Sequence, residues 1–290
     1  MLRLLAVVLA LSAGPLRAEG PHVVADIAPV HSLVAMVMGE HGTLDFLLPP
    51  DASPHHYSMR PSEAAALEKA DLVIWVGHGL TPWLERPVEQ LARSAAVLEL
   101  LDVAPVQIAF EEDHNHDHGH EGDVDPHAWL DPVNAAHWVG VIGEALAKAD
   151  PDKAEFYRKN AASAAARIDA LNDQIATAAK PLQMKPYAVH HDAYGYFEAR
   201  FGLEHRFAIT DSHAADPGPA RIAELRESIR NEGVECILTS GKENVGQLET
   251  VIEGHHAKVV KTDVTGADLS PGPLLYLDLM HRLSLALMSC

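Results

Sequence analysis

Residues 61–76, PSEAAALEKADLVIWV, decide the fold class. Pro61 and Ser62 are typical of a helix start, with Ser62 as the expected N-cap, and the segment after them predicts a helix through Ala70. Residues 72–76 are continuously apolar, which is typical of a strand covered on both faces of a parallel sheet. A helix that leads directly into such a strand predicts one unit of an α/β fold.

The same alternation of strands and helices continues on both sides of this unit. Further strands are expected at residues 23–25, 44–48, 187–190, 207–209, 236–239 and 258–260, and further helices at 29–38, 131–148, 195–200, 221–231, 245–253 and 274–287. After Pro151, residues 152–179 contain neither glycine nor proline, which favours one helix roughly 40 Å long. A helix of that length outruns one lobe, so it is expected to bridge two.

The predicted fold class is therefore α/β, with two lobes that face one another across a cleft. Each lobe has a parallel-type sheet flanked by helices, and one long helix joins the lobes. The expected boundaries are 19–150 for the first lobe, 151–180 for the bridging helix and 181–290 for the second lobe. Residues 111–125 are polar, acidic and rich in histidine, and they are expected to form a disordered loop.

The start of the chain indicates export. A basic Arg3 precedes an apolar run of about ten residues, the size of a signal-peptide core, so residues 1–18 are expected to be removed after Ala18. In an oxidising compartment Cys236 and Cys290 are expected to form a disulfide, with two unpaired thiols as the alternative. The net charge of −19 argues against nucleic acids and anionic membranes as partners.

Three short segments place histidines directly after strands or in structured loops. They are PHHYSMRPS at 54–62, DPHAWLDP at 125–132 and HHDAYGYF at 190–197. Neutral imidazole is a favoured zinc ligand, and three imidazoles with one further ligand make a tetrahedral site. Spacing alone does not establish such a site, because a single histidine is more often a surface or hydrogen-bonded residue.

With these segments the whole mature chain resembles the periplasmic solute-binding proteins of zinc ABC importers, the ZnuA-like group. The three segments match its motifs His-x-Tyr-x-x-x-Pro-Ser, Asp-Pro-His-x-Trp-Leu-Asp-Pro and His-Asp-Ala-Tyr-Gly-Tyr-Phe. The resemblance implies that His55, His127 and His191 hold one Zn²⁺ in the cleft between the lobes. It also implies a monomeric periplasmic protein, not an enzyme, whose partner is the membrane permease of a zinc ABC transporter. Whether a separate periplasmic metallochaperone loads it stays open.

The remaining ligand of such a site is the least defined part. Pro54 stands where some members of the group have an acidic residue, and residues 270–274 lack the carboxylate of manganese-binding relatives. Water is therefore the expected fourth ligand, and the alternatives are Asp268, Asp216 and His213. His56 and His190 adjoin proposed ligands, but neighbours in an extended segment point to opposite sides, so neither is expected to bind.

Two further features leave alternatives open. The loop histidines are expected to bind metal weakly or to be a solvated insertion; they are His114, His116, His118 and His120. Asp192 is expected either to orient the His191 imidazole or to cap the following helix. The alternative functions are a manganese or iron carrier of the same fold and a zinc hydrolase, although no Glu adjoins a ligand in the manner of His-Glu-x-x-His.

Overall fold

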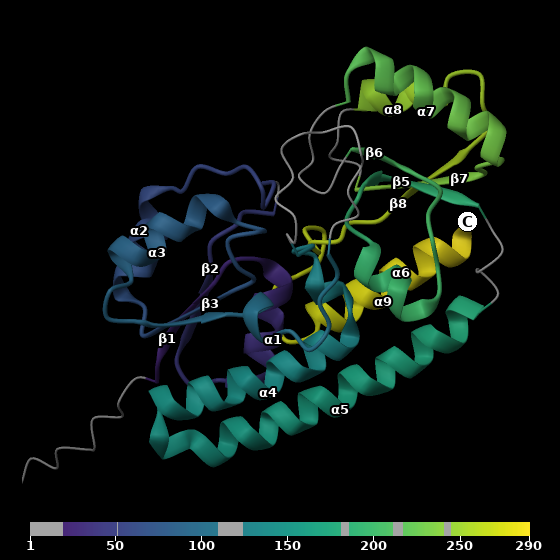
Figure 1. Cartoon of the computed structure of the whole chain (residues 1–290). Helices are drawn as coiled ribbons and strands as arrows, with labels where there is room; N and C mark the ends of the chain where they lie inside the picture. The colour runs from purple at the N-terminus through teal and green to yellow at the C-terminus, as the bar shows by residue number, and fades with distance from the viewer. Residues whose placement is uncertain (1–19, 51, 110–123, 181–185, 211–216, 241–244) are drawn as a thin grey trace, which may run out of the picture.

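Two four-stranded parallel sheets organise the chain in the computed structural model, which describes residues 20–50, 52–109, 124–180, 186–210, 217–240 and 245–290. The first sheet has the order β2-β1-β3-β4 and the second β6-β5-β7-β8. The strands are β1 (His22–Ala25), β2 (Thr43–Phe46), β3 (Leu72–Trp75), β4 (Ala96–Glu99), β5 (Tyr187–His191), β6 (Ala208–Thr210), β7 (Cys236–Thr239) and β8 (Lys258–Lys261). The two sheets lie in separate lobes (Figure 1).

Helices flank both sheets. The α-helices are α1 (Ala28–Met38), α2 (Pro61–Lys69), α3 (Glu85–Leu91), α4 (Pro132–Ala149), α5 (Ala154–Ala179), α6 (Gly195–Phe201), α7 (Pro219–Glu232), α8 (Val245–Ile252) and α9 (Leu275–Ser289). Single 3₁₀ turns are η1 (Pro82–Leu84), η2 (Leu101–Val103), η3 (Ala128–Leu130) and η4 (Pro151–Lys153). The predicted α/β class with two parallel sheets is confirmed, whereas the domain boundaries stay a prediction.

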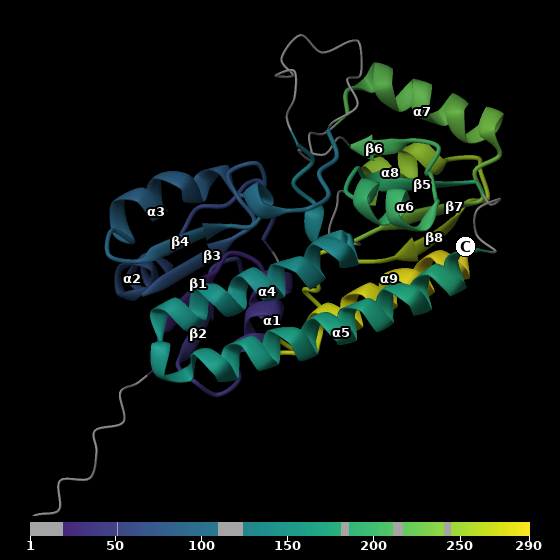
Figure 2. The same ribbon diagram turned by 60° about the horizontal axis from the view of Figure 1, so that its bottom comes forward.

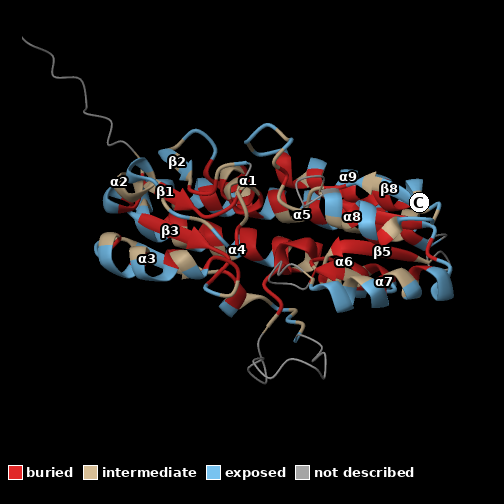
Figure 3. Cartoon of the chain, turned by 90° about the horizontal axis from the view of Figure 1, so that it is seen from above, coloured by how far each residue is buried: buried red, intermediate tan, exposed pale blue. Residues whose placement is uncertain are grey.

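The alternation of side chains along each strand divides the apolar residues between two clusters. In β1, Val23 and Ala25 face the central core, whereas Val24 faces a smaller cluster under α2 and α3. In β7, Leu238 faces the central core, whereas Ile237 packs in a third cluster under α7 and α8. The central strands are therefore buried on both faces, as the continuous apolar runs predict (Figure 3).

One central core runs through both lobes. It contains Val23 in the first strand and Leu287 near the end of the last helix. The long helix α5 packs against α4 and α1 in the first lobe and against α6 and α9 in the second. Figure 2 shows α9 running beside α5, and α9 also contacts α1. With 26 residues α5 is roughly 39 Å long, which lets one helix support both lobes.

Three local expectations need correction. The N-cap of α2 is Arg60 and not Ser62, because Pro61 takes the first helical position and the Glu63 carboxylate accepts the Arg60 backbone N–H at 2.6 Å. The long helix starts at Ala154, after a separate 3₁₀ turn at Pro151–Lys153. Strand β4 and helix α3 had no counterpart in the sequence expectations. Both are short, and β4 begins with two exposed residues, so it lacks a buried apolar run.

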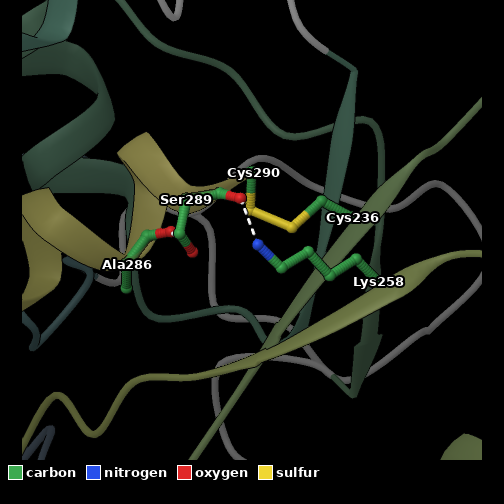
Figure 4. Close-up of a disulfide and its surroundings, with 5 residues drawn as sticks. All are labelled: Cys236, Lys258, Ala286, Ser289 and Cys290. Carbon is green, nitrogen blue, oxygen red and sulfur yellow. Dashed lines mark hydrogen bonds between the residues drawn. A yellow bond between two sulfur atoms is a disulfide. The ribbon is translucent and has the colours of Figure 1, made fainter.

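The expected disulfide is present. Cys236 at the start of β7 is bonded to Cys290 after α9, with the two Cα atoms 5.5 Å apart. Beside the bond, the Lys258 side chain of β8 donates to the Ser289 carbonyl at the end of α9 (Figure 4). The end of the last helix is thus attached to the second sheet by one covalent and one polar contact. The expected signal peptide at 1–18 lies outside the described residues.

Candidate metal centre

Three imidazoles from three separate segments meet between the lobes. His55 lies in the loop between β2 and α2, His127 stands at the N-cap of η3, and His191 ends β5. One ligand nitrogen from each lies within 4.8 Å of the others, and the ring centroids are 5.2–5.5 Å apart. His55 and His127 are buried and His191 is partly exposed, so the group has a side that faces solvent.

One pair of nitrogens has the spacing that a tetrahedral metal requires. His127 Nε2 and His191 Nε2 are 3.4 Å apart. Two nitrogens at about 2.05 Å from one zinc at the tetrahedral angle lie about 3.3 Å from each other. The structure therefore holds two imidazoles with their Nε2 atoms at the separation of neighbouring zinc ligands, with the third imidazole against both.

The orientation of His127 is set by a carboxylate that the sequence reasoning did not assign. Asp125 Oδ1 lies 2.7 Å from His127 Nδ1 and also accepts the His127 backbone N–H at 2.9 Å. A carboxylate beside Nδ1 favours the proton on that nitrogen and leaves the Nε2 lone pair for a metal. The detectable signal was the Asp-x-His spacing, since an Asp side chain commonly bonds to the backbone two residues later.

The neighbouring histidines lie outside the group, as expected. His190 precedes His191 in β5 and is 2% exposed, and the alternation of the strand places its side chain on the face opposite to that of His191. Thr210 donates a hydrogen bond to the His190 backbone carbonyl. His56 is exposed and is not a member of the group either. Alternation along β5 thus separates His190 from His191, whereas His55 and His56 lie in a bend of the loop before α2.

The other sequence candidates are placed less directly. Asp268 is described but is not a member of the group; it lines a separate hollow with Lys261 and Arg282. Within the described residues the group contains histidines alone, so no described carboxylate joins it. The remaining candidates lie outside the described residues, namely Asp216, His213, His114, His116, His118 and His120.

Asp192 does not cap α6, and its expected role in orienting the His191 imidazole stays a prediction. Its Oδ1 is 3.9 Å from His205 Nε2, and α6 begins after Tyr194 without a side-chain cap. Burial raises the pKa of Asp192. His205 in turn approaches the buried Glu198, at 2.8 Å between Nδ1 and Oε2, and the Tyr187 hydroxyl also donates to that carboxylate. Asp192 therefore belongs to a polar network beside the group.

None of the described helices combines the length and apolar character needed to cross a membrane. The chain has two α/β lobes, each with a parallel sheet, which share one long helix and hold a three-histidine group between them. This arrangement defines a solute-binding type of protein with a candidate metal centre. The chain belongs to the family described as "Zinc-uptake complex component A periplasmic", whose model matches residues 23–290. This is a family of solute-binding proteins. Membership in it supports zinc as the metal of the three-histidine group.

Similar proteins agree with this assignment along almost the full chain. A "High-affinity zinc uptake system protein ZnuA" from Paracoccus denitrificans (strain Pd 1222) is 38% identical, covering 99% of this chain and 96% of that protein. One of the same description from Brucella abortus (strain 2308) is 32% identical over 95% and 93%. The solved structure "Crystal structure of ZnuA" has a TM-score of 0.81 at 19% identity, covering 92% of this chain and 97% of that one, and shares the fold.

Proposed function

We propose that this protein captures Zn²⁺ in the periplasm with His55, His127 and His191 and delivers it to the permease of an ABC-type zinc importer. The observation that carries the proposal is the convergence of three imidazole nitrogens, from three segments far apart in sequence, to within 4.8 Å. An all-nitrogen group suits zinc, whereas manganese prefers oxygen ligands. Water completes the tetrahedron on the partly exposed side.

The family and the relatives named for zinc uptake support this cargo and this partner. Binding without turnover fits the group, because the Asp125 carboxylate beside it is engaged with the His127 ring and backbone and is not free to activate water. The export signal at 1–18 fits a periplasmic location. The sequence interpretation ended the histidine loop at residue 125, but Asp125 is buried and bonded to His127. The loop histidines before it gather additional zinc weakly.

A zinc titration against a chromophoric chelator tests the proposal. The wild type should bind one zinc tightly. The zinc affinity of His55→Ala, His127→Ala and His191→Ala should in each case fall by a larger factor than the roughly 10–100-fold that follows removal of a hydrogen-bond partner of a metal ligand. His56→Ala is the matched control, because His56 is adjacent to His55 but exposed and outside the group. Equal affinity of His55→Ala and His56→Ala would refute the ligand assignment.

Two further measurements separate the alternatives. Deletion of residues 112–123 should remove weak additional sites and leave the tight site intact. Metal analysis of the protein isolated from its native periplasm should find zinc; manganese or iron would favour the carrier alternative. Zinc affinity should fall from pH 8 to pH 5, because protons compete with the metal for imidazole nitrogens, and a free imidazole side chain has a pKa of about 6.5. A flat profile contradicts the three-imidazole site.

A further inference from the structure

We propose that Arg200 is a positioning residue for the metal centre. Through its ion pair with Asp131 it holds His127 and His191 as a preassembled two-imidazole half-site, which His55 then completes from the other lobe. The inference rests on the proposed function. It also distinguishes the three ligands: His127 and His191 are connected to each other through protein contacts, whereas His55 is held by a separate loop.

The ion pair joins the two ligand-bearing segments by short paths. Arg200 Nε donates to Asp131 Oδ1 and Arg200 Nη2 to Asp131 Oδ2, both at 2.8 Å. Asp131 follows His127 by four residues, across the single turn η3, and its side chain also caps α4 by accepting Val133 N–H at 2.8 Å. Arg200 lies on α6, the helix that follows the His191 segment. The pair therefore connects the turn after one ligand to the helix after the other.

Two more hydrogen bonds attach the His127 segment to the second half of the chain. The Tyr276 hydroxyl of α9 donates to the Trp129 carbonyl at 2.9 Å. The Trp129 indole donates to the Val264 carbonyl, also at 2.9 Å. Trp129 is fully buried, and its ring centroid is 5.3 Å from that of His127. The η3 turn is thus held between α6, α9 and the chain after β8, although it precedes α4 of the first lobe.

The loop that carries His55 is attached to its own lobe. The Trp83 indole in η1 donates to the Pro54 carbonyl at 2.8 Å. The Tyr57 hydroxyl donates to Glu63 at the start of α2, also at 2.8 Å. These contacts flank His55 on both sides. His55 is therefore positioned by the first lobe. The His127 turn is bonded to α4 through Asn134, and it is also attached to the second lobe, which carries His191.

The chemistry of the pair explains why arginine is needed. Asp131 is 2% exposed and Arg200 is 30% exposed, so the pair is largely withdrawn from water. A guanidinium meets a carboxylate with two parallel N–H groups, which fixes orientation as well as distance. A lysine ammonium at the same place keeps the positive charge near Asp131 but cannot form the two-pronged contact. Arg200→Lys thus loosens the half-site without leaving a buried carboxylate wholly uncompensated.

The test compares Arg200→Lys with a matched change elsewhere. Arg158 and Glu144 form a pair of the same geometry, at 2.7 and 2.8 Å, but both side chains are more than half exposed and join α5 to α4. Arg200→Lys should weaken zinc binding by about tenfold, the lower end for groups that support ligands indirectly. It should also change the visible absorption of the Co²⁺-loaded protein. Arg158→Lys should leave both unchanged.

A combination of variants tests the half-site itself. On a His55→Ala background, Arg200→Lys should weaken the residual metal binding by the same factor as in the wild type. On a His191→Ala background it should have little further effect, because the half-site is already lost. The inference is overturned if Arg200→Lys only lowers the melting temperature of the metal-free protein, with wild-type zinc affinity and Co²⁺ spectrum. Absence of zinc binding by the wild type would instead remove the proposed function.

Discussion

The contact between Asp125 and His127 predicts a specific cost for a change of one atom. In Asp125→Asn a neutral amide oxygen still reaches the His127 Nδ1–H, but the hydrogen bond is no longer assisted by charge. A hydrogen bond to a charged group contributes roughly 1.5–3 kcal/mol and a neutral one roughly 0.5–1.5 kcal/mol, so the loss between the middles of the two ranges is about 1.3 kcal/mol. That free energy corresponds to about tenfold weaker zinc binding. Asp125→Ala removes the acceptor entirely and should approach 100-fold.

Competition with a chromophoric chelator at pH 7.5 measures these zinc dissociation constants directly. Asp192→Asn is the control for a general effect of negative charge, because Asp192 adjoins His191 but its carboxylate faces His205 at 3.9 Å. The expected order of affinity is wild type, then Asp192→Asn close to it, then Asp125→Asn, then Asp125→Ala. If Asp125→Asn binds zinc as tightly as Asp192→Asn, the orientation of His127 by Asp125 does not contribute to the site.

Three further predictions concern stability of the metal-free protein, each measured by chemical denaturation. Burial raises the pKa of Asp26 to about 7, so between pH 4 and pH 7 the native state keeps a proton that the unfolded chain has lost. The unfolding free energy of the wild type, compared with that of Asp26→Asn, should therefore fall from pH 4 to pH 7 by up to roughly 4 kcal/mol. A difference between the two proteins that does not change with pH contradicts the raised pKa. Replacing Cys236 and Cys290 with serine should lower the unfolding free energy by about 4 kcal/mol for a separation of 54 residues, without altering zinc affinity at 25 °C; no loss would show that the disulfide adds no stability. In α4, Gly140→Ala should stabilise the protein by about 1 kcal/mol, since nothing lies within 4 Å of the added methyl. Gly143→Ala should destabilise it by about 1–3 kcal/mol, since that methyl would be 2.8 Å from a side chain of α5. Equal effects of the two changes would contradict close α4–α5 packing.

The sequence predicted the parts of the fold that depend on local patterns. Strands β3 and β7 are buried along their whole length, and their continuous apolar runs made them visible. Strand β4 was missed because it pairs through its backbone while Ala96 and Val97 stay exposed. The cap of α2 was misassigned because Pro61 takes the first helical position, which places the N-cap at Arg60, two residues before Ser62.

The candidate site divides in the same way. Each imidazole was predicted from a motif within its own segment, and the expectation that the three share one ion came largely from the resemblance of those motifs to a known family. The supporting contacts were not predictable from one sequence. Arg200 and Asp131 are 69 residues apart, and nothing in either segment names the other as its partner. Asp125 was within reach of local reasoning, because its spacing to His127 already allowed the contact.

The continuous core has a consequence for how this protein can be divided. Because Val23 and Leu287 belong to one apolar cluster, the two lobes are not separable modules. A fragment that ends after α5 lacks α9, which covers part of α5 and α1, and would leave that apolar surface in water. The molecule is therefore expected to melt as one cooperative unit and to resist proteases only when the segment from β1 through α9 has assembled.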